Sequence, residues 1–343
     1  MTPTASAMQS ELREAAAVVE RQACIVAAPL AGLIERLRRR RPGFVVTCAR
    51  GSSAHAASFA KHLIERHLGL PVAAAAPNIA AVYRRALTLK DQLFLAISQS
   101  GRSDDLIETA AMARAAGAIT AAIVNDPDSP LARACEIVLP LGAGPEFSVA
   151  ATKSFVASLA AALRLTAAWT KDAAMALALT RLPGRLADAA QLDWSEALNV
   201  LTDAASLVTI GRGPTLAIAR EAALKLKETC ALHAEAFSAA EFRHGPIALV
   251  SGAYPIVVFK PGDESAAGCA ELVADLRGKG ACVLVAEPGR GQSGVLPALA
   301  PDHPDADAIC LIRSFYALLV SLAARRGTDV DRPRHLQKVT RTR

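Results

Sequence analysis

Short apolar runs alternate with helix-like segments along most of the chain, and this alternation limits the folds open to it. Runs at residues 44–49, 93–97 and 119–124 are rich in β-branched and other apolar residues. A helical pattern follows the first run over Ala54–His67, and another follows the second over Asp104–Ala116. Continuous apolar strands separated by helices are typical of a parallel sheet covered on both faces. The sequence therefore predicts an α/β fold.

The same order of segments returns in the second half of the chain. Expected strands and helices alternate there in the order 207–210, 217–230, 254–259, 267–279 and 282–285. An offset of 162 residues aligns Arg50-Gly51 with Arg212-Gly213, each at the turn after the first strand of its half. We therefore expect two doubly wound parallel-sheet subdomains related by internal duplication.

The expected organisation has four parts. They are an N-terminal helical segment 1–43, a first subdomain 44–180, a second subdomain 190–326 and a C-terminal tail 327–343. Residues 152–200 have a mostly helical pattern and join the two halves.

The composition is that of a helix-rich globular protein. Its 343 residues are 52% hydrophobic, 20% charged and 4% aromatic, which excludes a disordered chain and a small disulfide scaffold. The seven cysteines are odd in number and lack CxxC spacing, so we interpret them as reduced thiols of a cytoplasmic protein. Residues 1–7 do not resemble a signal peptide. The apolar stretch Ala23–Ile34 contains Pro29 and Gly32 and is too short to span a bilayer, so we expect no membrane partner.

A formal net charge of +6 makes nucleic-acid binding a possibility that must be tested against the sequence. The basic residues are spread along the chain, and the one cluster, Arg36–Arg41, ends a helical pattern, where the helix dipole favours cations. No zinc-finger or RNP pattern is present. We expect no nucleic-acid partner and interpret the charge as suited to phosphorylated metabolites.

The segment Ser98–Ser103 is a candidate anion site, because it follows an expected strand and opens an expected helix. Hydroxyls and free backbone N–H groups converge there on the positive end of the helix. The segment matches neither the P-loop nor GxGxxG, so a nucleotide is not favoured. An ordinary turn with Ser103 as N-cap is an equally good interpretation. Arg50–Ser53 forms a similar turn at the carboxyl end of its strand, the edge where open parallel sheets bind ligands.

A second candidate site is a dense group of ionisable residues in the other half. Glu221 and Lys225 are four residues apart, and Lys225 and Glu228 three apart, on one expected helix. A sheltered Glu beside a Lys can move protons of a carbon acid, although this spacing more often marks a plain surface ion pair. His244 lies in an expected loop, where it can reach a ligand. His233 is eleven residues away and HExxH is absent, so we expect no metal.

Taken together, seven ordered segments resemble one known family. The segments are 48–53, 98–101, 144–153, 221–228, 233–237, 244–246 and 327–334. They resemble the isomerase part of glutamine–fructose-6-phosphate amidotransferase, which is built from two sugar-isomerase (SIS) domains. The resemblance extends from about residue 10 to residue 340 and implies a flavodoxin-like, three-layer αβα fold for each half.

The resemblance implies roles for the matching residues. The substrate-binding residues would be Ser52, Ser53, Ser98, Gln99, Ser100, Ser103 and Val149. Glu228 would move a proton between C1 and C2 of the sugar, and Lys225 would tune its proton affinity. His244, supplied by the partner subunit of a homodimer with a composite active site, would open the sugar ring. Lys338 would lie at the amino-bearing end of the sugar, and neither cofactor nor metal is implied.

The sequence also departs from the family pattern. The family carries an N-terminal glutaminase domain with a cysteine directly after the initiator Met, whereas Thr2 follows Met1 here. Arg102 stands where the synthases carry Glu, and Ala151 where they carry Ser. Without an ammonia donor, the expected activity is that of a glucosamine-6-phosphate deaminase, which forms fructose 6-phosphate and ammonia.

Two other functions stay open. The first is a deglycase of fructosamine-type 6-phosphates, which would share the fold and release a different amine. The second is a sugar-phosphate regulator without turnover. Glu228, His244 and Lys338 argue against the regulator, because a binding module needs no proton-transfer groups.

Overall fold

The computed structural model describes residues 5–289 and 291–338, which form two compact units. The sheet A unit contains the described parts of 17–146, 153–180 and 337–343, and the sheet B unit those of 1–16, 147–152 and 181–336. The four-part division expected from the sequence stays a prediction. The boundary between the units runs through two long helices, α1 (Ala7–Arg39) and α7 (Ala173–Ala189).

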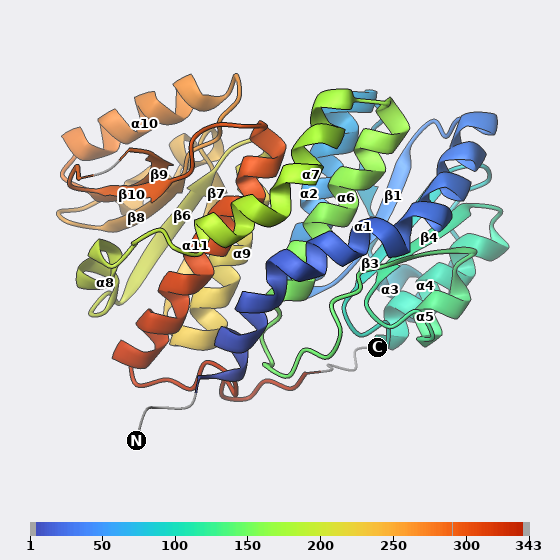
Figure 1. Ribbon diagram of the computed structural model, residues 1–343, viewed down its shortest axis with the longest axis horizontal. Helices are drawn as coiled ribbons and strands as arrows, with labels where there is room; N and C mark the ends of the chain where they lie inside the picture. Colours follow the sequence, from blue (N-terminus) through green and yellow to red (C-terminus); the bar gives the residue numbers. More distant parts are fainter. Residues whose placement is uncertain (1–4, 290, 339–343) are drawn as a thin grey trace. The chain divides into compact units, whose positions relative to one another are not determined.

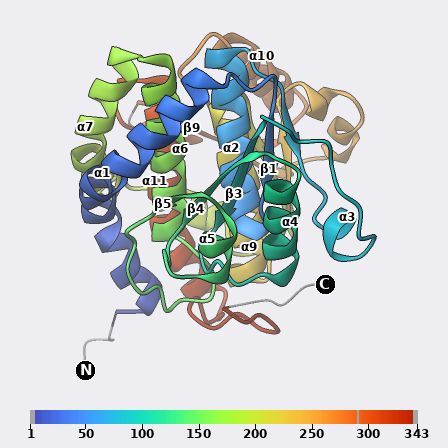
Figure 2. The same cartoon turned by 90° about the vertical axis from the view of Figure 1, so that its right-hand side faces the viewer.

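Sheet A has five parallel strands in the order β2-β1-β3-β4-β5. Their bounds are β1 Val45–Cys48, β2 Val72–Ala74, β3 Leu93–Ser98, β4 Ile119–Val124 and β5 Ile137–Pro140. The helices of this unit are α2 Gly51–Leu68, α3 Asn78–Ala81, α4 Asp104–Ala115, α5 Pro130–Ala134 and α6 Lys153–Thr170. Helices α4 and α5 cover one face of the sheet, and α2 and α6 cover the other (Figure 2).

Sheet B has five parallel strands in the order β10-β9-β8-β6-β7. Their bounds are β6 Ser206–Gly211, β7 His233–Ser238, β8 Pro255–Phe259, β9 Cys282–Pro288 and β10 Val295–Ala298. The helices are α8 Glu196–Leu201, α9 Pro214–Cys230, α10 Ala266–Gly278 and α11 Pro304–Arg325, with 3₁₀ turns η1 Glu241–Arg243 and η2 Pro246–Leu249. Helix α10 covers one face, and α9 and α11 cover the other (Figure 1).

The two sheets repeat one topology. Numbered within its own half, each runs in the order 2-1-3-4-5, which is the flavodoxin-like doubly wound arrangement. The offset of 162 residues also holds for whole elements, since β3 and β8 begin at Leu93 and Pro255, and α4 and α10 begin at Asp104 and Ala266. The predicted pair of three-layer αβα subdomains related by duplication is therefore confirmed.

Helix α1 begins against the C-terminal segment of the sheet B unit. The backbone N–H groups of Ala7 and Met8 donate to the Asp331 carboxylate at 2.8 and 2.9 Å. A carboxylate in this position caps the first turn of a helix and interacts favourably with its dipole. Arg36, Arg38 and Arg39 fall in the last turn of α1, as the dipole interpretation of the basic cluster predicted.

Two helices of the described chain, α1 and α11, are long and apolar enough to cross a membrane by length and composition. In α11, 78% of the most apolar stretch is buried inside its unit, which is expected of a core helix that packs on a sheet. In α1, 33% of the most apolar stretch is buried. Helix α1 continues through Pro29 and Gly32, although proline and glycine were expected to interrupt its apolar stretch.

The seven cysteines are all free thiols, as predicted. Burial raises the pKa of Cys48, Cys135 and Cys310 to about 12, so these thiols stay protonated. Cys24 is exposed and departs from the pattern of buried thiols.

Candidate active site

The loop between β3 and α4 is the predicted anion site, and its serine hydroxyls accept backbone N–H groups of the loop itself, including that of Arg102, which donates to Ser100 Oγ at 3.3 Å. Ser98 ends β3, and its hydroxyl accepts the N–H of Gly101 at 3.0 Å. Gly101 has φ of 63°, and a Cβ at this position would lie 2.1 Å from Ser129 Oγ, so the loop accepts only glycine. Ser103 takes the N-cap position of α4, but its side chain makes no capping bond. The alternative interpretation, in which Ser103 caps α4 with its hydroxyl, therefore lacks the side-chain hydrogen bond that it predicts.

The corresponding loop of sheet B is built differently. It runs from Lys260 to Ser265, and Asp263 Oδ1 accepts the backbone N–H and the hydroxyl of Ser265 at 3.0 and 2.5 Å. The protein's own carboxylate thus occupies the start of α10 and would repel an anion there. The loop in sheet A differs in that the N-cap residue, Ser103, makes no side-chain capping bond, and the predicted phosphate site there stays a prediction.

Ser52 and Ser53, the other predicted sugar contacts of the sheet A unit, lie in the first turn of α2. Both are half-buried, as are Gln99 and Ser100. Because β1 and β3 are neighbours in the sheet, the first turn of α2 and the loop after β3 lie at the same carboxyl edge.

The charged residues of α9 form a buried group in the sheet B unit. Lys225 Nζ lies 2.6 Å from Glu228 Oε2 and 3.3 Å from Glu221 Oε1. The Lys225 and Glu221 side chains are 1% and 0% exposed, whereas Glu228 is 21% exposed. The plain surface ion pair is therefore the wrong interpretation of this spacing. Tyr316 of α11 donates its hydroxyl to Glu221 Oε1 at 3.1 Å.

Lys225 keeps its charge despite complete burial. Burial alone would lower the pKa of its ammonium, but the Glu221 and Glu228 carboxylates outweigh that effect and raise the pKa above its ordinary value. The Lys225 ammonium, 2.6 Å away, fixes the orientation of the Glu228 carboxylate, whose exposed part stays accessible to a ligand. This arrangement can present a carboxylate base to a carbon acid.

His244 and Val149 are placed by loops of the same unit. His244 follows η1, is exposed, and donates its backbone N–H to the Glu241 carbonyl at 2.9 Å. Val149 is half-buried, and its backbone N–H donates to the Asp331 carbonyl at 3.1 Å. Ring opening by His244 and a sugar contact at Val149 both stay predictions.

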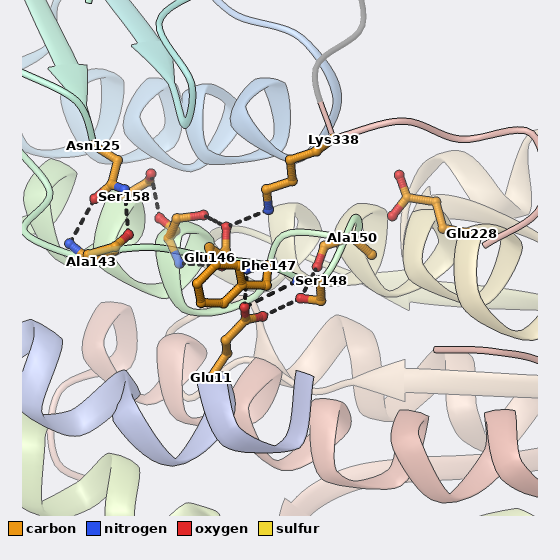
Figure 3. A network of polar contacts seen from close by, with 12 residues as sticks. Glu11, Asn125, Ala143, Glu146, Phe147, Ser148, Ala150, Ser158, Glu228 and Lys338 are labelled. Carbon is orange, nitrogen blue, oxygen red and sulfur yellow. Dashed lines mark hydrogen bonds and ion pairs between the residues drawn. The ribbon is translucent and has the colours of Figure 1, made fainter. Parts of the chain in front are cut away.

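Lys338 has a partner that the sequence did not indicate. In the sheet A unit its ammonium lies 3.2 Å from Glu146 Oε2 (Figure 3). The Glu146 side chain is 0% exposed and also accepts the backbone N–H and hydroxyl of Ser154 at 3.1 and 2.6 Å. Glu146 thus anchors the C-terminal segment that carries Lys338.

A second buried carboxylate holds the segment after Glu146. In the sheet B unit, Glu11 of α1 accepts the backbone N–H of Ser148 at 3.1 Å, together with the backbone N–H of Phe147 and the hydroxyl of Ser148 (Figure 3). The segment therefore owes its shape to a helix far away in the sequence. Neither Glu11 nor Glu146 stands out from the sequence, because each is a lone acid without a spacing pattern.

The described residues were also compared with the ligand sets that bind metal ions. In residues 5–289 and 291–338, no three His, Cys, Asp or Glu side chains form a group that could hold a metal ion. The expected independence from metal and cofactor stays a prediction.

Comparison with known proteins gives the family. The SIS domain model matches residues 41–168 and 200–286, which is more than half of the chain. The chain therefore belongs to the SIS-domain family. It is 33% identical over 308 residues to a glutamine–fructose-6-phosphate aminotransferase (isomerizing) of Bradyrhizobium diazoefficiens, covering 84% of this chain and 50% of the relative. The chain thus spans about half the length of the curated relatives it matches.

Solved structures agree with this assignment. A Silicibacter pomeroyi protein, provisionally assigned as a phosphosugar isomerase, has a TM-score of 0.90 and 41% identity and covers 95% of this chain and 100% of its own. The C-terminal domain of a glucosamine–fructose-6-phosphate aminotransferase from Francisella tularensis has a TM-score of 0.84 and 25% identity, with coverage of 96% and 99%. A glucosamine-6-phosphate deaminase from Thermotoga maritima shares the fold, with a TM-score of 0.76 and 21% identity over 98% and 100% of the two chains. The predicted homology to the isomerase part of the aminotransferases is confirmed.

Proposed function

We propose that this protein is a phosphosugar isomerase that acts as a glucosamine-6-phosphate deaminase, converting glucosamine 6-phosphate and water to fructose 6-phosphate and ammonia. The observation that carries the proposal is the partly exposed Glu228 carboxylate, held 2.6 Å from the buried ammonium of Lys225 in a chain of the SIS family. Aldose–ketose conversion needs one base that can both remove and return a proton.

The proposed chemistry has three steps. His244 opens the sugar ring by taking the proton of the C1 hydroxyl and delivering a proton to the ring oxygen, while the C1–O5 bond breaks and the C1 aldehyde forms. Glu228 then removes the proton from C2 and delivers it to C1, which leaves an imine at C2. Water adds to the imine carbon, the C–N bond breaks, and ammonia leaves while the carbonyl of fructose 6-phosphate forms.

The other substrate-binding residues have separate tasks in this proposal. The loop 98–103 holds the phosphate, and Ser52, Ser53 and the backbone near Val149 contact the sugar. Lys338, anchored by Glu146, lies near the amine. A homodimer with His244 supplied across its interface, a cytoplasmic location, and the absence of nucleic-acid and membrane partners stay predictions.

The test is to incubate the purified protein with glucosamine 6-phosphate and to assay ammonia and fructose 6-phosphate together. Equimolar release of both products supports the proposal. Turnover only of glycated-amine 6-phosphates would replace it with the deglycase. Binding without turnover of either substrate would leave a sugar-phosphate regulator.

A further inference from the structure

We infer that Arg50 is a further phosphate-binding residue, whose guanidinium is oriented by the buried Asp105 and receives the sugar phosphate beside the loop 98–103. The inference rests on the proposed function, because it takes that loop as the phosphate subsite. Arg50 is not among the residues to which the family resemblance assigns a role.

Strand register places Arg50 beside the loop. Strands β1 and β3 are neighbours, with Cys48 opposite Ala96. Two residues further on, Arg50 follows β1 and Ser98 ends β3, so both leave the sheet at its carboxyl edge. In the order 2-1-3-4-5 the chain turns in opposite directions after these two strands, and the crevice at such a point is where open α/β sheets bind ligands.

The alternation of side chains along the extended segment places Arg50 on the same face of the sheet as α4. Val46 and Cys48 pack in the core that α4 covers, and Arg50 is next in the same alternation. Its Nε and Nη2 atoms donate to Asp105 Oδ2 at 3.0 and 2.6 Å. Asp105 belongs to the first turn of α4, directly after the loop.

The two partners differ sharply in exposure. The Asp105 side chain is 1% exposed, whereas that of Arg50 is 51% exposed. A guanidinium has five N–H groups in a fixed plane, and two of them bind Asp105 here. The carboxylate therefore acts as an anchor, and the exposed part of the guanidinium is available to a second anion in bidentate geometry.

The charge balance of α4 requires a cation at this place. Asp104 and Asp105 both lie in its first turn, where they would repel a phosphate of about −1.5 to −2 charges. Arg50 neutralises Asp105. Arg102, the other arginine of the site, is 58% exposed and pairs with Asp126 at 3.0 Å instead. Arg50 is thus the arginine tied to the helix whose N-terminus would bind the phosphate.

Titration calorimetry with fructose 6-phosphate and with inorganic phosphate tests the inference without turnover. We compare the wild type with Arg50→Gln, Arg50→Lys and the double variant Arg50→Gln/Asp105→Asn. The double variant removes the guanidinium but leaves no unpaired buried charge, so it separates ligand binding from stability. Arg84→Gln is the matched control, because Arg84 is an exposed arginine of the same unit that pairs with Glu108.

The expected result is at least a tenfold loss of affinity for both ligands in Arg50→Gln and in the double variant, a smaller loss in Arg50→Lys and no change in Arg84→Gln. Affinities of the double variant within twofold of the wild type would overturn the inference and leave Arg50 as a neutralising partner of Asp105. A wild type that binds fructose 6-phosphate through Arg50 but releases no ammonia from glucosamine 6-phosphate would overturn the proposed function and support the phosphate contact.

Discussion

At the scale of single residues, Lys225 is buried between two carboxylates and orients Glu228, the proposed base. Lys225 contacts Glu228 at 2.6 Å and Glu221 at 3.3 Å. Tyr316 contacts Glu221 from α11. The spacing of the three charges was visible in the sequence, but their burial depends on α11, which lies about 90 residues away in the chain. The sequence therefore predicted the pair and could not distinguish a core arrangement from a surface one.

Removing the ammonium of Lys225 should lower the stability of the fold. Lys225→Met removes the ammonium that lies 3.3 Å from the fully buried Glu221 carboxylate, so we expect a loss of about 3–5 kcal/mol in unfolding free energy. Because the folded-state pKa of Lys225 lies above its ordinary value of 10.5, its contribution is fully present below pH 10.5 and is lost as the pH rises further. Thermal unfolding of both proteins from pH 7 to 11 measures this. A difference in Tm that disappears between pH 7 and 9 would contradict it.

Lys338 and Glu146 should behave as one coupled pair. Lys338→Met removes the ammonium that lies 3.2 Å from the buried Glu146 carboxylate, so we expect a loss of about 1–3 kcal/mol. Adding Glu146→Gln removes the buried negative charge and should restore much of that stability without restoring deaminase activity. A double-mutant cycle of urea unfolding measures the coupling. Additive free energies would show that the contact does not anchor the tail.

At the scale of elements, the central strands could be predicted and most edge strands could not. Strands β3, β4 and β8 are continuous apolar runs because both of their faces are covered. The three strands missed from the sequence, β2, β7 and β10, all lie at sheet edges. Strand β7 has the sequence His-Ala-Glu-Ala-Phe-Ser with exposed polar positions, so its apolar signal is weak. The offset of 162 could not find it either, because the matching strand, β2, is also too weak a signal in the sequence.

The duplicated loops supply a matched pair of serine variants. Ser103 precedes α4 with its hydroxyl not engaged in capping, and Ser265 precedes α10 with its hydroxyl bound to Asp263. We expect Ser103→Ala, like Ser100→Ala, to raise KM for glucosamine 6-phosphate with little change in kcat, because phosphate binding is largely uniform binding. Ser265→Ala should leave KM unchanged. Steady-state kinetics decide, and an unchanged KM in both Ser100→Ala and Ser103→Ala would remove the loop from the site.

At the scale of the whole molecule, one duplicated fold carries two different sets of chemistry. The sheet A unit has the proposed phosphate loop and Lys338, which contacts Glu146, and the sheet B unit has the buried charge group of α9 and His244. Duplication preserved strand order and spacing while the residues at the carboxyl edges diverged. The family resemblance identified the matching motifs. It assigned no role to Arg50 and Glu146, which lie in the matching segments 48–53 and 144–153, or to Glu11, and each of the three has a partner from a distant part of the chain.

Subunit mixing tests the composite site. If His244 acts across a dimer interface, a heterodimer of one Glu228→Gln subunit and one His244→Ala subunit retains one intact site. Unfolding and refolding an equimolar mixture of the two inactive variants should then restore about a quarter of wild-type activity, since half of the dimers are mixed and half of their sites are intact. No recovery in mixtures shown by mass to contain heterodimers would place His244 in the same subunit as Glu228.

The most direct test of the central claim is the turnover of glucosamine 6-phosphate by Glu228→Gln. Loss of the base should lower kcat by a factor of about 10²–10⁴ while KM stays close to the wild-type value. Glu271→Gln, the same change at an exposed glutamate of α10, should leave both constants unchanged. Near-full release of ammonia and fructose 6-phosphate by Glu228→Gln would contradict the assignment of Glu228 as the group that moves the proton.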